Sequence, residues 1–112
     1  LDAELNDSET ARKIFAALPL ESEFNTWGDE IYFSIPMTLE LENGQEVVEM
    51  GDLGYWPPGR AFCIFFGTTP ASQGDEIRPA SAVTVVGKVQ GEVTTLKQVS
   101  AGEQVSIEAA TE

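Results

Sequence analysis

The chain has 112 residues, of which 19 are acidic, six are basic and none is histidine, and its formal net charge at pH 7 is −13. This length suits a single domain, residues 1–112, and a 42% hydrophobic content is typical of a globular protein. Without histidine, the chain has neither a Ser-His-Asp or Cys-His nucleophile nor a His-ligated zinc site. Its one cysteine, Cys63, excludes an internal disulfide.

The negative charge also limits the partners of the chain. Nucleic acids and anionic membranes are not expected, because both attract clustered lysine and arginine side chains. The acidity itself has three open explanations, namely solubility, adaptation to high salt and a cationic partner. No run of about 18 apolar residues is present, and the chain starts at Leu1 with no methionine and no signal-like segment, so we expect a cytoplasmic protein with a trimmed N-terminal end. No metal or cofactor is predicted.

The N-terminal part has the patterns of a strand and then a helix. Residues 1–5 alternate between apolar and acidic, which predicts a half-buried strand whose partner is expected upstream of residue 1. The residues 6–8, Asn-Asp-Ser, offer helix N-caps, and Pro19 ends the segment that follows. That segment predicts one amphipathic helix with an apolar face of Ala11, Ile14, Phe15 and Leu18.

From residue 24 onward the pattern is that of short β-strands. Alternation or continuous apolar runs predict strands at 31–35, 39–42, 52–56, 61–66, 83–89 and 105–107. The 61–66 run is apolar on both faces, so we expect this strand to be covered on both sides. The dipeptide Asn43-Gly44 predicts a two-residue hairpin, and Pro57-Pro58-Gly59 predicts a type II turn.

Two segments near the C-terminal half are predicted to lie outside the strands. Residues 67–81 hold glycines and prolines and predict a loop of about fifteen residues, a length that is often functional. Residues 93–99 predict one or two helical turns. Seven or eight short strands with one clear helix favour a closed antiparallel barrel over a sandwich, because a barrel has no free edges and a helix can cover its open end.

Two aromatic segments, 25–33 and 51–67, hold both tryptophans, both tyrosines and four of the six phenylalanines. With residues 69–72 and 80–89, they resemble the small cyclophilin-like proteins of bacteria and archaea, which have no established activity. The most specific stretch is the run Gly-Asp-Leu-Gly-Tyr-Trp-Pro-Pro-Gly-Arg at 51–60. The resemblance implies a mainly β fold: a closed eight-stranded barrel with a capping helix and a second short helix, its first strand missing here.

A more distant resemblance links residues 86–91 to true peptidyl-prolyl isomerases. In those enzymes an arginine polarises the prolyl amide, whose rotation has a barrier of about 18–20 kcal/mol. The corresponding segment here, 27–33, has no arginine, and the histidine of the isomerase pocket is absent. Arg60 is the one arginine near an aromatic cluster, and it belongs to a different strand. Classical isomerase activity is therefore not expected, and the question of enzymatic activity stays open.

The aromatic segments predict a ligand site on the face of the barrel, because such sites are apolar with a few convergent polar groups. The aromatic side chains would form walls, an arginine would pair with a carboxylate, and an acidic side chain would accept hydrogen bonds. The predicted site residues are Trp27, Glu30, Tyr32, Tyr55, Trp56, Arg60, Phe65 and Thr69. The competing interpretation is that the aromatic side chains only fill the barrel.

Three functions follow as hypotheses. The first is binding of a small molecule or short peptide at this site. The second is prolyl isomerisation by an altered site, and the third is a structural or regulatory interaction domain anchored by Tyr55 and Trp56. The sequence leaves the oligomeric state open. Cys63 has no base available and is expected to be buried and inert.

Overall fold

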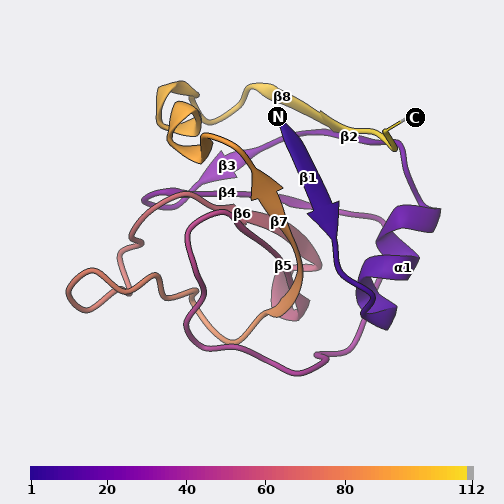
Figure 1. Ribbon diagram of the computed structural model, residues 1–112, viewed down its shortest axis with the longest axis horizontal. Helices are drawn as coiled ribbons and strands as arrows, with labels where there is room; N and C mark the ends of the chain where they lie inside the picture. The colour runs from indigo at the N-terminus through magenta and orange to yellow at the C-terminus, as the bar shows by residue number, and fades with distance from the viewer. Residues whose placement is uncertain (111–112) are drawn as a thin grey trace.

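The computed structural model describes residues 1–110, and most of its regular structure is β-strand (Figure 1). The elements in chain order are β1 (Asp2–Leu5), α1 (Glu9–Ala16), β2 (Leu20–Glu23), β3 (Asn25–Thr26), β4 (Glu30–Ser34), β5 (Asp52–Trp56), the 3₁₀ helix η1 (Pro57–Gly59), β6 (Ala61–Phe65), β7 (Thr84–Gln90), the 3₁₀ helix η2 (Val93–Gln98) and β8 (Gln104–Ile107). The loop between β6 and β7 extends from the left of the molecule in Figure 1.

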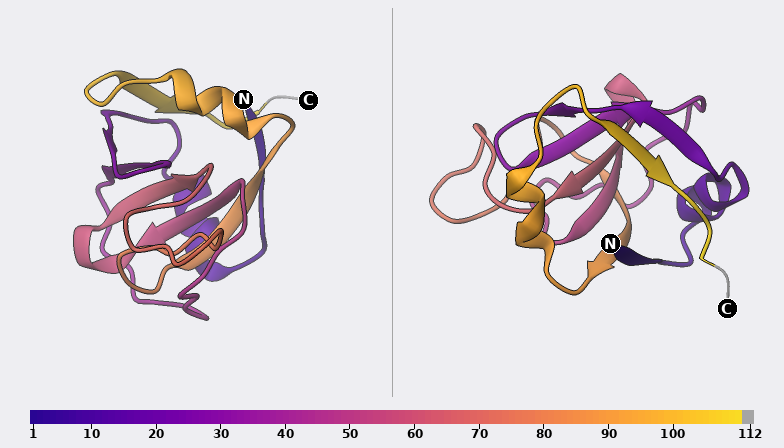
Figure 2. Two further views of the ribbon diagram at one scale, coloured as in Figure 1. Left: turned by 90° about the vertical axis from the view of Figure 1, so that its left-hand side faces the viewer. Right: turned by 90° about the horizontal axis from the view of Figure 1, so that it is seen from above.

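The eight strands of residues 1–110 form two sheets. Six of them are hydrogen-bonded in the order β1-β7-β5-β6-β4-β3, and β2 pairs with β8 in a separate two-stranded sheet. The prediction of a closed eight-stranded barrel is therefore not confirmed. No ladder joins the two sheets in residues 1–110. The chain passes from the two-stranded sheet to the six-stranded sheet at Phe24, between β2 and β3. Figure 2 shows β2, β8 and η2 gathered at one end of the molecule.

The predicted N-terminal strand and helix are confirmed, with two differences. Strand β1 has its partner downstream, in β7, where Asp2 lies opposite Gln90. Helix α1 is capped by the hydroxyl of Ser8 and buries Ala11 and Ile14. Phe15 was expected on the same face but is 54% exposed, because it lies at the margin of the narrow buried face of this short helix.

Strand β6 is covered on both sides, as its two apolar faces predict. It lies between β4 and β5, and its alternating side chains enter two separate clusters. The main core takes Phe62 and Ile64 together with side chains of α1 and of the β2–β8 sheet. The second core lies under the long loop and contains Val48, Ala61, Cys63, Phe65, Ile77 and Val83.

The segment predicted as a strand at 39–42 and as a hairpin at Asn43-Gly44 has neither structure. Its polar groups bind other elements instead. The N–H of Glu42 donates to the Thr84 hydroxyl over 2.8 Å, and the Glu42 carboxylate accepts from the N–H of Thr10 over 3.0 Å. The segment thus caps the start of α1, and this long-range contact outweighs its local preference for a hairpin.

The proline turn after β5 differs in type from the prediction. Residues 57–59 form a 3₁₀ turn, and Arg60, not Gly59, has the left-handed conformation with φ 48°. The prediction of one or two helical turns at 93–99 is confirmed by the 3₁₀ helix η2. Within residues 1–110, we find no helix long and apolar enough to cross a membrane.

Candidate ligand-binding cavity

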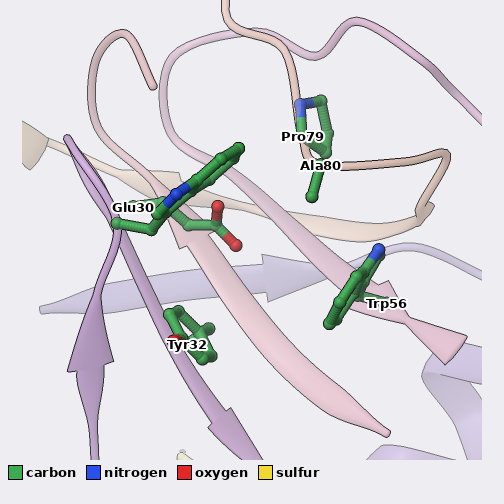
Figure 3. Close-up of a pocket in the computed structure, with 6 residues that line it drawn as sticks. Glu30, Tyr32, Trp56, Pro79 and Ala80 are labelled. Carbon is green, nitrogen blue, oxygen red and sulfur yellow. The ribbon is translucent and has the colours of Figure 1, made fainter. Parts of the chain in front are cut away.

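A cavity of about 250 Å³ lies on the face of the six-stranded sheet that carries the second core (Figure 3). In Figure 3, Glu30 and Trp56 lie on opposite sides of the space, and Pro79 and Ala80 lie above it. The residues that line it are Trp27, Glu30, Tyr32, Trp56, Pro79 and Ala80. Strands β4 and β5 and the loop between β6 and β7 thus each contribute a wall.

Strand β4 places two of these side chains by simple alternation. Glu30 and Tyr32 are two residues apart, so they share one face of the strand, while Ile31 and Phe33 point into the main core. Tyr32 lies opposite Cys63 in the ladder with β6. The cavity therefore borders directly on the packed side chains of the second core.

Trp27 comes from the turn that joins β3 to β4. Its N–H donates to the carbonyl oxygen of Glu30 over 2.9 Å, and Gly28 has a φ of +61°. A Cβ atom at Gly28 would stand 2.9 Å from the carbonyl oxygen of Thr68 and from the Cα of Thr69. The turn therefore requires glycine both for its conformation and for its close contact with the long loop.

Trp56 is the last residue of β5, and the following turn leaves room for its ring. A Cβ atom at Gly59 would stand 2.7 Å from the six-membered ring of the indole. The absence of a side chain at Gly59 thus lets the indole pack closely against the proline turn, where it is half-buried. This packing holds the indole on the cavity side of the sheet.

The long loop is held in place by polar groups that do not line the cavity. The hydroxyl of Thr69 donates to the carbonyl oxygen of Arg78, and the N–H groups of Thr69 and Arg78 both donate to the Ser72 hydroxyl, over 3.0 and 3.2 Å. These bonds tie the start of the loop to the residue before Pro79. The part of the loop that covers the cavity, which includes Pro79 and Ala80, is therefore held by hydrogen bonds to the start of the same loop.

Glu30 gives the cavity its only ionisable carboxylate. The residue is 6% exposed, and burial raises its pKa to about 7 from an ordinary value of 4.5. A hydrogen bond with the Cys63 thiol lowers the pKa again in part. No lysine or arginine lies within 4 Å of Glu30 in the described chain, so its charge is not neutralised by an ion pair.

Cys63 is buried, as predicted, and burial next to Glu30 raises the pKa of its thiol. It therefore stays protonated near neutral pH and is a poor nucleophile. Within residues 1–110, no group of three or more cysteine, aspartate or glutamate side chains is arranged to hold a metal ion.

Comparison with known proteins identifies the family. A model described as cyclophilin-like matches residues 1–108. The chain belongs to the cyclophilin-like family. Among solved structures, this cyclophilin-like chain is similar to the hypothetical protein AF2241 from Archaeoglobus fulgidus, solved in solution, with 49% identity and a TM-score of 0.81. The alignment covers 96% of this chain and 85% of that chain. A comparison with curated proteins found no match.

The cavity of the cyclophilin-like chain brings together half of the site residues predicted from sequence. Trp27, Glu30, Tyr32 and Trp56 line it, and their ligand-binding role stays a prediction. Pro79 and Ala80 were not predicted individually. Their one signal in the sequence is their position in the long loop, and nothing local indicates which part of that loop returns to the sheet.

The other four predicted site residues lie elsewhere. Tyr55 is fully buried on the opposite face of the sheet, and Phe65 is fully buried in the second core. Thr69 is buried and holds the loop. Arg60 is exposed after η1 and does not line the cavity. The cyclophilin-like domain therefore has a cavity whose charged lining is a single glutamate.

Proposed function

We propose that this cyclophilin-like domain binds a small molecule, or one side chain of a short peptide, in the cavity between β4, β5 and the long loop. The observation that carries the proposal is the Glu30 carboxylate, which is buried among aromatic side chains without a cationic partner in residues 1–110. Burial of an unpaired carboxylate is unfavourable for folding. Such residues in a cavity are therefore candidates for a functional role.

The shape of the cavity supports the same proposal. Binding sites for small molecules are concave and mostly apolar, with a few polar groups that fix the orientation of the ligand. A volume of about 250 Å³ lies just below the usual range of such sites, about 300–1,000 Å³, so we expect a ligand group the size of one amino-acid side chain. The adjoining second core is a cluster of buried side chains, and Tyr32 and Trp56 pack against it from the cavity side.

The two other hypotheses receive less support. Prolyl isomerisation by an amide-polarising arginine would need a guanidinium in the cavity, and Arg60 does not line it. An interaction surface anchored by Tyr55 and Trp56 would need both rings accessible, but Tyr55 is fully buried. Neither alternative explains the buried carboxylate.

The test is a screen of fluorinated fragments by ¹⁹F NMR, with a variant that fills the cavity. Ala80 is exposed at the cavity wall, so Ala80→Trp should occupy the space without disturbing the core. The matched control is Ala16→Trp, at an exposed position on α1, which packs against the main core. Fragments that bind the wild type and the control but not Ala80→Trp would support the proposal. An absence of binding fragments, or binding that survives Ala80→Trp, would contradict it.

A further inference from the structure

We propose that the cavity is selective for a quaternary ammonium group, which it holds between its aromatic rings with the Glu30 carboxylate as counter-ion. This inference rests on the proposed function, since it names the chemical class of the ligand for the same cavity. It is carried by the composition of the lining, which consists of two indoles, one phenol ring, a proline, an alanine and one carboxylate.

The aromatic part of the lining favours a cation. The faces of indole and phenol rings carry negative potential and attract cations within about 6 Å, with tryptophan the most effective. Three of the six lining residues have such rings, namely Trp27, Tyr32 and Trp56. Trp56 lies across the cavity from Glu30 in Figure 3, so a group between them would contact a ring on one side and the carboxylate on the other.

The carboxylate supplies the opposite charge. Glu30 points into the cavity in Figure 3 and has no lysine or arginine partner within residues 1–110. An anion in a site of low dielectric gains more from a cation than the same anion gains in water. The net charge of −13 also raises the local concentration of cationic ligands around the whole molecule.

The scarcity of polar groups selects among cations. A primary ammonium carries three donors and a guanidinium carries five, and each donor needs an acceptor when it is buried. Among the lining side chains, the acceptors are the Glu30 carboxylate and the Tyr32 hydroxyl. A quaternary ammonium has no N–H donor, so it loses no hydrogen bond when carbon walls surround it. The apolar remainder of the lining thus fits a methylated ammonium better than the other two groups.

The test compares choline with 3,3-dimethylbutan-1-ol, which has the same shape without the charge. Binding is measured by NMR titration of the full chain at constant, near-physiological ionic strength and at about pH 8, above the pKa of Glu30. We expect choline to bind wild type at least about tenfold more tightly than the alcohol does. Glu30→Gln should reduce this preference to the part that the aromatic rings supply, while the exposed Glu40→Gln, which removes the same charge, should keep it in full. Ethanolamine, with a primary ammonium, should bind more weakly than choline.

Lowering the pH gives a second readout within the same experiment. Among the groups of residues 1–110, the Cys63 thiol is the one that affects the pKa of Glu30, and Tyr32 shares the cavity wall. Choline cannot lose a proton, so its affinity for wild type should fall as Glu30 is protonated below about pH 7. The alcohol should show no such loss.

The other outcomes overturn the inference in different ways. Equal binding of choline and the alcohol would contradict charge selectivity and leave the proposed function standing. Tighter binding of ethanolamine would contradict the choice of a quaternary group. A preference for choline that is as large in Glu30→Gln as in wild type would contradict the role of Glu30. If neither probe binds, the inference is wrong, and the separate fragment screen decides the proposed function.

Discussion

The indole N–H of Trp56 donates a 2.7 Å hydrogen bond to the hydroxyl of Ser81, 25 residues along the chain. This bond joins the end of β5 to the loop that carries Pro79 and Ala80. The Trp56 side of the cavity is thus bonded to the loop that covers it, so the orientation of the indole depends on this loop as well as on β5.

Replacement of Ser81 by alanine tests this link. We expect Ser81→Ala to free the Trp56 indole and to lower the free energy of unfolding by no more than about 1 kcal/mol, since the bond is exposed. The measurement is hydrogen exchange of the two indole N–H groups by NMR. Exchange at Trp56 should become faster, with Trp27 unchanged as the internal control. Unchanged exchange at Trp56 would show that the bond does not hold the ring.

Replacement of Tyr55 by phenylalanine tests the opposite face of the sheet. The Tyr55 hydroxyl donates to the carbonyl oxygen of Met37 over 3.0 Å and accepts from the N–H of Leu39 over 3.1 Å, and the residue is fully buried. Loss of the hydroxyl leaves the Met37 carbonyl and the Leu39 N–H without this partner. Tyr55→Phe should therefore lower the free energy of unfolding by about 1–3 kcal/mol.

Urea unfolding of Tyr55→Phe is best measured beside Tyr32→Phe. The hydroxyl of Tyr32, on the cavity side, makes no hydrogen bond with residues 1–110, so this control should change stability by less than about 0.5 kcal/mol. Equal effects of the two substitutions would mean that Tyr55 does not anchor the 37–39 segment.

Gly28 and Gly74 allow crowding to be separated from backbone strain. Both have positive φ, +61° at Gly28 and +69° at Gly74. A Cβ atom added at Gly28 would lie 2.9 Å from atoms of the long loop, whereas a Cβ atom added at Gly74 would have no neighbour within 4 Å. Gly74→Ala should therefore lower stability by about 1–2 kcal/mol through strain alone. Gly28→Ala should lower it further and should also shift the fluorescence of Trp27. Thermal unfolding that gives the same loss for both would contradict the close contact between the turn and the loop.

Much of the site could be predicted from sequence because strand alternation is a local property. The alternation in 30–34 is enough to place Glu30 and Tyr32 on one face. The same rule separates Tyr55 from Trp56, since adjacent residues of a strand face opposite sides, so only one of the two could line a single cavity. The prediction that included both residues in the site did not apply this rule.

The remaining features depend on contacts that sequence does not display. Pro79 and Ala80 reach the cavity because the hydrogen bonds of Thr69 and Ser72 fold the long loop back over the sheet. The hairpin expected at Asn43-Gly44 is replaced by contacts with α1 and β7, both far away in the chain. Barrel closure likewise depends on which edges meet, and short strands with similar patterns do not specify this.

The stability of the protein should depend on pH through Glu30. Its pKa is about 7 in the folded state against an ordinary value of 4.5, so the folded state binds more protons between these two values. Wild type should therefore lose stability relative to Glu30→Gln as the pH rises through this window, and between about pH 4 and pH 8 the difference should shift by about 3 kcal/mol in favour of the variant. Below about pH 4 the difference should have levelled off.

Chemical denaturation at a series of pH values measures this difference directly. The exposed Glu40→Gln serves as the control, because it removes one carboxylate that is not buried, and its stability should follow wild type at every pH. A Glu30→Gln curve that runs parallel to wild type would mean that Glu30 is as well solvated in the folded state as in the unfolded one.

The central claim is that Glu30 is a buried carboxylate facing an aromatic cavity, and its own titration tests this most directly. In a protein labelled with ¹³C, the side-chain carboxyl signal of Glu30 can be assigned by its absence in Glu30→Gln and followed against pH. The structure predicts a midpoint at about pH 7. A midpoint near the ordinary value of 4.5 would place the carboxylate in water and contradict the cavity that Trp27, Tyr32 and Trp56 form around it.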